Sequence, residues 1–236
     1  MEPSNRTARL AGWWYLACAL TAPFSLIYVP STLIQHDDPA ATIKNLLASE
    51  SLFRWSLFTG LLSTVAFMIA VLMLYRLLAP VSRALGLAMV GLALITVPIS
   101  VLDAIHGVLT LNLLHGAKLL SGVDVALRQS MALVFVALGG PIVAVSELFW
   151  GLWLFPLGAL VIRSRFLPRW LGAVLLVNGL AYTAVSFAAI VEPAYLATMN
   201  RLATIPEFGE LVFILWLLIR GIRVEAPVPG VASSAG

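Results

Sequence analysis

The few ionisable side chains inside the apolar stretches of this sequence are its candidates for binding or catalysis. Asp103 and His106 are three positions apart, so they can contact each other on a helix. Glu147 interrupts the apolar run VSELFWG, and Arg54 and Glu210 each stand close to the start of another. A charge at the bilayer centre costs on the order of 2.5–3.5 kcal/mol by insertion scales, so such residues should be partnered or protonated, and they are often functional.

Counting along helices predicts that these residues lie at similar depths. At 1.5 Å per residue, Arg54, Asp103 and Glu147 stand about 24–33 Å above the arginine at the inner end of their own helix. These arginines are Arg76, Arg83 and Arg163. We therefore predict one polar cluster in the outer half of a helix bundle, made of Arg54, Asp103, His106, Glu147 and Glu210. A secondary polar row on one further helix consists of Asn178, Tyr182 and Ser186. The cluster is either a ligand, ion or proton site or a buried ion-pair network that fixes which helices meet.

The sequence predicts no metal site, no cofactor and no catalytic residues. His106 and His115 are nine positions apart, which places them on nearly opposite helix faces, and no HExxH spacing occurs. No P-loop, GxSxG or glycine fingerprint is present. The single cysteine, Cys18, excludes an intrachain disulfide and a thiolate zinc cluster.

The composition indicates a membrane protein. Of 236 residues, 61% are hydrophobic and only 11% are charged, whereas soluble domains contain about 25% charged residues. The mean hydropathy is +1.01. The net charge of +3 and pI of about 9.4 do not indicate nucleic-acid binding, because the basic residues are dispersed among apolar segments.

The apolar segments predict an all-α fold, a bundle of six transmembrane helices in a single domain over residues 1–225. The expected spans are 10–30, 52–78, 84–114, 127–162, 170–191 and 205–222. Asp38 is expected to cap a short interfacial helix in the first outer loop, PAATIKNLLA. Thr204 and Glu207 are expected to form a capping box that opens the sixth helix. Residues 226–236 have the composition of a disordered tail.

The fourth segment is too long for a single perpendicular crossing, at about 54 Å if helical throughout. We predict one long helix that is kinked at Gly139-Gly140-Pro141. On this helix Gly140, Ala144, Glu147, Gly151 and Gly158 share one face. A stripe of small residues allows a neighbouring helix to approach closely, so Glu147 should face a packed interior.

Basic residues predict the orientation. If the N-terminus is inside, the inner side receives nine of them, Arg6, Arg9, Arg76, Arg83, Arg163, Arg165, Arg169, Arg220 and Arg223. The outer side receives five, Lys44, Arg54, Lys118, Arg128 and Arg201. This asymmetry favours the cell membrane with both termini in the cytoplasm.

Five segments are informative when read together: ARLAGWWYL, ASESLFRWSLF, LYRLLAPVSRALG, ELFWGLWLFPLGALVIRSRFLPRWLGAVLL and GELVFILWLLIRG. Together they resemble a bacterial membrane family known only as domain of unknown function number 4386. The resemblance covers residues 7 to 222 and implies a six-helix integral membrane protein. It supplies no catalytic or binding residues to transfer.

Three functions remain open. The first is binding or passing a small molecule or proton through the polar cluster. The second is a structural or accessory subunit that partners another membrane protein or a second copy of itself. The third is a membrane enzyme using Asp103, His106 and Glu147, which would need a cavity and a histidine within about 3 Å of a carboxylate.

Overall fold

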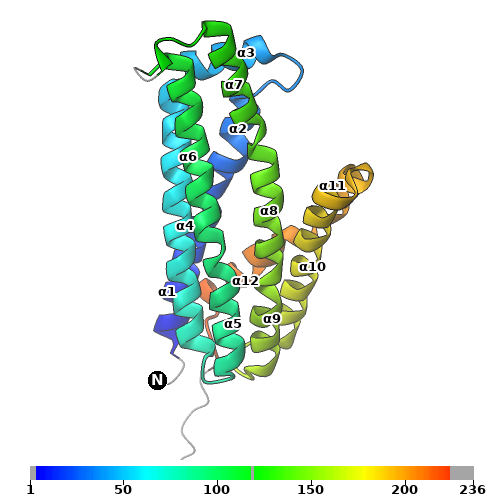
Figure 1. Cartoon of the computed structure of the whole chain (residues 1–236). Helices are drawn as coiled ribbons and strands as arrows, with labels where there is room; N and C mark the ends of the chain where they lie inside the picture. Colours follow the sequence, from blue (N-terminus) through cyan, green and yellow to red (C-terminus); the bar gives the residue numbers. More distant parts are fainter. Residues whose placement is uncertain (1–3, 118–119, 224–236) are drawn as a thin grey trace, which may run out of the picture.

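The computed structural model describes residues 4–117 and 120–223, and every regular element in these ranges is a helix (Figure 1). The tail predicted at 226–236 lies outside the described residues. Five helices of the described chain are long and apolar enough to cross a membrane, or six if one bent pair counts as a span. The all-α prediction is therefore confirmed, with five to six candidate spans.

The first three spans occupy the N-terminal half of the chain. The first consists of α1 (Asn5–Pro23), a π-helical turn η1 (Phe24–Tyr28) and α2 (Val29–Leu33). A short helix α3 (Pro39–Ala48) leads to α4 (Glu50–Leu78). The third span combines α5 (Arg83–Leu94) and α6 (Thr96–His115).

The remaining spans are more irregular. The fourth combines α7 (Val125–Ala137), α8 (Gly139–Leu152) and α9 (Leu154–Arg163). The fifth is α10 (Arg169–Val191). The last part comprises η3 (Pro193–Tyr195), α11 (Leu196–Ala203), η4 (Pro206–Phe208) and α12 (Gly209–Ile219).

Prolines explain the interruptions within the third and fourth spans. A proline lacks the N–H that would bond to the carbonyl four residues earlier, and its ring clashes with that carbonyl. In each case the preceding helix ends four residues before a proline, whereas α4 and α10 contain no proline and are uninterrupted. The pairs are Leu94 and Pro98, Ala137 and Pro141, and Leu152 and Pro156.

The fourth span is one long, interrupted helix, as predicted. Residues 125–163 form a single span of 39 residues, and the first interruption falls at Leu138, beside the expected glycines. A second interruption at Trp153 was not predicted, although Pro156 is its sequence signal.

The predicted sixth span, 205–222, corresponds to η4 and α12, which end at Ile219 and count as a candidate span only together with the preceding Pro193–Ala203. α11 and α12 meet at a bend of 49° between Ala203 and Pro206. Thr204 does not form a capping box: its Oγ1 donates to the carbonyl of Asn200 at 2.8 Å, on the last turn of α11. Pro206 cannot continue a helix from that turn, which accounts for the break.

The Asp38 cap is confirmed, because the backbone N–H of Ala41 donates to Asp38 Oδ1 at 2.9 Å. α3 then packs through Leu46, which is buried with Val29 and Leu33 of α2. This part of the molecule is the end opposite to the termini (Figure 1).

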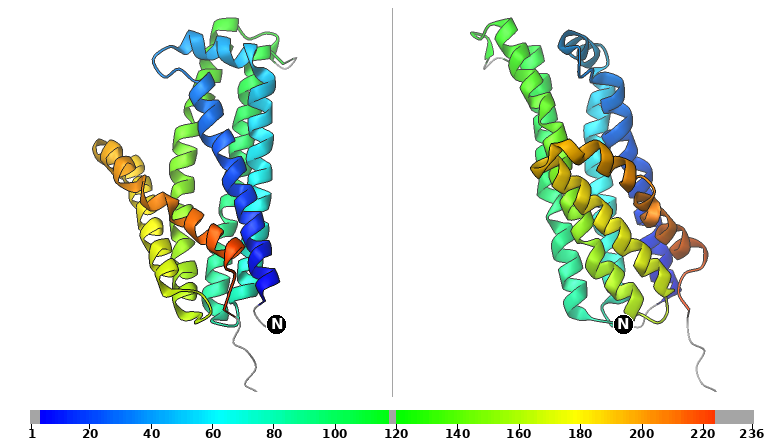
Figure 2. Two further views of the ribbon diagram at one scale, coloured as in Figure 1. Left: turned by 180° about the vertical axis from the view of Figure 1, so that it is seen from behind. Right: turned by 90° about the vertical axis from the view of Figure 1, so that its right-hand side faces the viewer.

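The described residues begin at Ser4 and end at Arg223 at the same end of the bundle, called here the terminal end. The N–H of Ile222 donates to Asn5 Oδ1 at 2.7 Å, and this bond joins the segment after α12 to the first residue of α1. Figure 2 shows α10 and α12 covering only the half of the bundle near this end, while α4, α6 and α7 extend beyond them. The main core lies in this half, where Trp153 packs edge-on against Phe67 and Tyr15, with ring centroids 5.0 and 5.9 Å away.

Candidate functional site

The best-constructed polar site of the described chain surrounds Glu210, in the first turn of α12. The Tyr15 hydroxyl on α1 donates to Glu210 Oε1. Asn178 Nδ2 on α10 donates to Glu210 Oε2 at 3.4 Å. The Tyr15 ring is held by the core aromatic residues, so its hydroxyl is fixed in direction. One carboxyl group thus receives hydrogen bonds from two helices distant in sequence.

A glycine makes this meeting of helices feasible. Gly209 lies against α10, where an added Cβ would be 2.8 Å from Val174 Cγ1 and 3.4 Å from Asn178 Cβ. Any larger residue would push the start of α12 away from Asn178. Asn178 itself is fully buried (0% exposed), and its Oδ1 has no hydrogen-bond partner in the described chain. A buried amide oxygen without a partner is unfavourable, so this atom is available to a donor.

Two further carboxyl groups approach this region. Glu147 on α8 and Glu207 in η4 are close enough for their charges to interact, and the Tyr182 hydroxyl lies within electrostatic reach of both. The Tyr182 ring packs edge-on against Trp150, with centroids 6.1 Å apart. In the part of the chain that is described, no basic nitrogen lies within 4.0 Å of Glu147, Glu207 or Glu210. The region is rich in carboxyl groups and lacks a counter-cation.

Asp103 and His106 form a separate pair on α6. His106 Nδ1 lies 3.5 Å from Asp103 Oδ1, as the three-residue spacing suggested. The contact does not meet hydrogen-bond geometry, and His106 Nδ1 remains without a hydrogen-bond partner among the described residues. The His106 ring faces the start of α8, where a Cβ on Gly139 would be 3.9 Å from Nε2.

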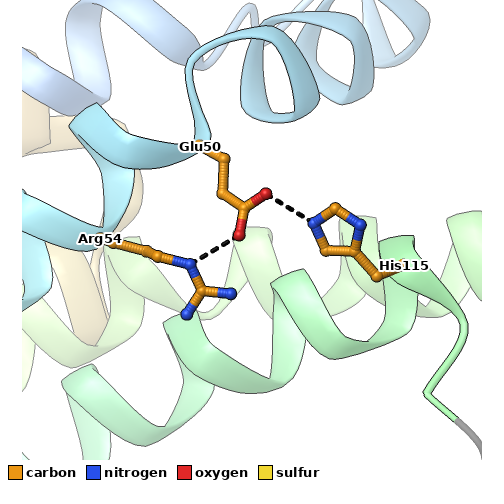
Figure 3. Close-up of polar contacts among 3 residues, drawn as sticks. All are labelled: Glu50, Arg54 and His115. Atoms are coloured by element: carbon orange, nitrogen blue, oxygen red, sulfur yellow. Dashed lines mark hydrogen bonds and ion pairs between the residues drawn. The ribbon is translucent and has the colours of Figure 1, made fainter.

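Arg54 belongs to a third group, at the end opposite to the termini (Figure 3). Its Nε donates to Glu50 Oε1 at 2.6 Å, one helical turn away on α4. The other oxygen of Glu50 lies 2.7 Å from His115 Nε2 on α6. The Arg54 side chain is 52% exposed, so it extends to the surface and not into the bundle.

Direct contacts among the described residues divide the predicted cluster into separate groups. No hydrogen bond or ion pair of the described residues joins Arg54, Glu147 or Glu210 to one another or to the Asp103–His106 pair. The prediction compared depth along each helix, but depth does not specify which way a side chain points. Arg54 also has an acidic neighbour four positions before it, a local pairing that the prediction overlooked.

The secondary polar row has two structural members. The Ser186 hydroxyl donates to the carbonyl of Ala144 on α8 at 2.6 Å and is buried. Asn178 contacts Glu210 as described above, and Tyr182 faces Trp150. The row thus joins α10 to both α8 and α12.

Sequence reasoning missed Tyr15, Glu50 and the role of Glu207. Tyr15 is 195 positions from Glu210, and no local pattern connects them. Glu207 was interpreted as a cap, but it makes no capping hydrogen bond in the described chain. The sequence contained a signal for this role, because two glutamates within four residues stand at the start of a strongly apolar helix.

Two pockets in the described chain are not lined by the residues of the predicted cluster. One lies beside α10 and α11, with a volume of about 440 Å³. The other lies at the terminal end, with a volume of about 230 Å³. Asp103, His106 and Glu147 line neither of these two pockets. No group of three or more His, Cys, Asp or Glu in the described ranges could hold a metal ion.

The long apolar helices define a multi-pass membrane protein of the all-helical class, with polar residues enclosed between spans. Residues 10–221 match the family described as Domain of unknown function (DUF4386), and the chain belongs to that family. It is also 31% identical over 83 residues to an uncharacterized protein of Archaeoglobus fulgidus. That similarity covers 34% of this chain and about half (47%) of the relative. No solved structure matches.

Proposed function

We propose that this protein binds and passes a proton, alone or with a small protonated molecule, through the Glu210 site. The observation on which the proposal depends is the environment of Glu210. Its carboxyl group accepts hydrogen bonds from two uncharged donors and forms no ion pair with any of the described residues. A carboxylate without a counter-charge in an apolar interior is costly, and taking up a proton removes that cost.

The position of the site supports the proposal. Glu210 lies about 15 Å along α12 from Arg220, at 1.5 Å per residue. If the arginines mark one membrane surface, this is about the middle of a hydrocarbon core about 30 Å thick. Glu210 also follows directly on the break between α11 and α12. Interrupted helices near the membrane centre are where transporters place ion and substrate sites.

The other acids supply further steps across the bundle. Measured from Arg163 and Arg83, Glu147 and Asp103 lie about 24 and 30 Å from the terminal end. Together with Glu210 they form a series at increasing depth. We also propose that the protein lies in the cell membrane with both termini in the cytoplasm, since the terminal end holds nine arginines.

Proton flux into liposomes tests this function. The full chain is reconstituted in vesicles containing a pH-sensitive dye, and a pH gradient is imposed. Wild type should acidify the interior faster than empty vesicles, and Glu210→Gln should reduce the rate to that of empty vesicles. Glu192→Gln, at an exposed acid outside the site, is the matched control and should retain the wild-type rate. A wild-type rate equal to that of empty vesicles would reject the proposal.

A structural or accessory role is the second candidate, favoured by the way Glu210 links three helices. Its two hydrogen bonds join α1, α10 and α12. Glutamine keeps an acceptor for Tyr15, so under this role Glu210→Gln should fold normally and leave proton flux unchanged. Copurification of a stoichiometric membrane partner, together with unchanged flux, would select this function over the first.

A further inference from the structure

A pocket at the terminal end of the bundle combines aromatic and basic residues. It has a volume of about 230 Å³ and lies between the α9–α10 turn and the end of α12. Phe166 and Pro168 line one side, and Trp216, Arg220 and Arg223 line the other. None of these residues belongs to the Glu210 site, so a ligand in this pocket is independent of the proposed proton function.

The wall of the pocket is fixed by backbone contacts. After α12 the chain turns at Gly221, whose φ of 65° is in the left-handed region that glycine adopts at little cost. The N–H of Arg223 then donates to the carbonyl of Phe166 at 3.0 Å. The N–H of Ile222 donates to Asn5 Oδ1 at 2.7 Å. These contacts place the two arginines at the end of α12 beside the α9–α10 turn.

The charge at this pocket is uncompensated in the described chain. Arg220 and Arg223 have no carboxylate within 4.0 Å among the described residues. Arg165 and Arg169 add positive charge from the adjacent turn, and they too have no acidic partner there. The N-terminus of the 23-residue helix α10 begins at the same place and also favours an anion.

The surroundings identify what kind of anion fits. Trp216 packs edge-on against Trp170, with ring centroids 5.6 Å apart, and Trp170 is exposed. Tryptophan is enriched where a helix meets the membrane surface. Just before Arg220 in sequence, α12 presents Leu215 (42% exposed) and Ile219 (69% exposed). A charged pocket below an exposed apolar helix face matches a molecule with an anionic head and an acyl tail.

We infer that this pocket binds the phosphate of an anionic phospholipid headgroup. The guanidinium groups of Arg220 and Arg223 pair with the phosphate oxygens, a geometry that arginine favours because it presents parallel N–H donors. The indole of Trp216 lies at the glycerol level, and the acyl chains run along the exposed face of α12. Basic pockets between helices at a membrane surface bind anionic lipids in this way.

The test measures the affinity of the purified full chain, in a neutral detergent, for phosphatidylglycerol, with phosphatidylcholine and inorganic phosphate as reference ligands. Wild type should bind phosphatidylglycerol in preference to phosphatidylcholine. Arg220→Gln with Arg223→Gln should weaken that binding about 30-fold, at about 1 kcal/mol per basic residue. The same pair changed to lysine should bind with intermediate affinity, since the charge is kept but the paired donors are lost.

The matched control is Arg76→Gln with Arg83→Gln, which removes the same charge at the same end but outside the pocket. It should bind phosphatidylglycerol like wild type. An equal loss in the control pair would overturn the inference, because general surface charge would explain the binding. Equal binding of inorganic phosphate and phosphatidylglycerol would also overturn it, because the site would then recognise free phosphate and not a lipid.

Discussion

Gly151 on α8 and Gly179 on α10 lie in direct backbone contact. A Cβ on Gly151 would stand 2.6 Å from the carbonyl oxygen of Gly179, and a Cβ on Gly179 would stand 2.9 Å from that of Gly151. Seven residues after Gly151 and seven residues before Gly179, Gly158 on α9 and Gly172 on α10 repeat the contact at 2.8 and 2.5 Å. Gly151 and Gly158 of the predicted stripe therefore form one side of an antiparallel interface and α10 supplies the other, whereas a Cβ on Gly140 would meet nothing within 4 Å.

Replacing Gly151 by alanine should destabilise the protein. The new methyl group has no space against the α10 backbone, and overpacking of this kind costs roughly 1–3 kcal/mol. Thermal unfolding in detergent should show a lower midpoint. Gly140→Ala is the control on the same helix, because a Cβ there meets nothing within 4 Å. Equal midpoints for the two variants would contradict the close packing described.

Removing the Tyr15 hydroxyl should weaken the Glu210 site without disturbing the core. Tyr15→Phe retains the ring contacts with Phe67 and Trp153 but leaves Glu210 with one donor. We expect a loss of roughly 1 kcal/mol of unfolding free energy.

The control is Tyr75→Phe, since the Tyr75 hydroxyl makes no hydrogen bond in the described chain. A double-mutant cycle with Glu210→Leu, which removes the acceptor, should show coupling for Tyr15 and none for Tyr75. Additive effects at Tyr15 would mean that the hydroxyl and the carboxyl group do not interact.

The Glu50 contacts should have a small effect that depends on salt. Glu50 bridges α4 to His115 on α6, but its partners Arg54 and His115 are about half exposed. Exposed ion pairs contribute little and are screened. Glu50→Gln should therefore lower the thermal midpoint slightly at low salt and not at high salt.

Glu192→Gln, at an exposed acid with no ion pair in the described chain, should be neutral at both salt concentrations. A large, salt-independent loss for Glu50→Gln would show that the contact is buried in the assembled protein.

Cysteine labelling tests the proposed orientation. In a Cys18→Ser background, Asp37→Cys lies in the loop before α3, and Pro80→Cys lies in the turn after α4, at the terminal end. A membrane-impermeant maleimide should label position 37 in intact cells and position 80 only after permeabilisation. The reverse pattern would place the termini outside, against the expectation from the basic residues.

Features that depend on neighbours along the chain were predictable from the sequence. Apolar runs specified the helices, and prolines specified where the third and fourth spans are interrupted, because each proline removes a bond to a carbonyl four residues earlier. Asp38 capped the helix that follows it, and Asp103 met His106 one turn away. Each of these interactions lies within a single turn, so residue spacing is sufficient to predict it.

Tertiary packing alone decides which helices bring their polar residues into contact. Counting residues gives the depth of a carboxyl group, but the 49° bend before α12 and the rotation of each helix set its direction. Tyr15 therefore reaches Glu210 across 195 positions, whereas Arg54, predicted beside Asp103, pairs with Glu50 at the surface. Contacts between helices depend on close packing of whole faces, as at Gly151 and Gly179. The sequence of one helix does not specify which face of which other helix will pack against it.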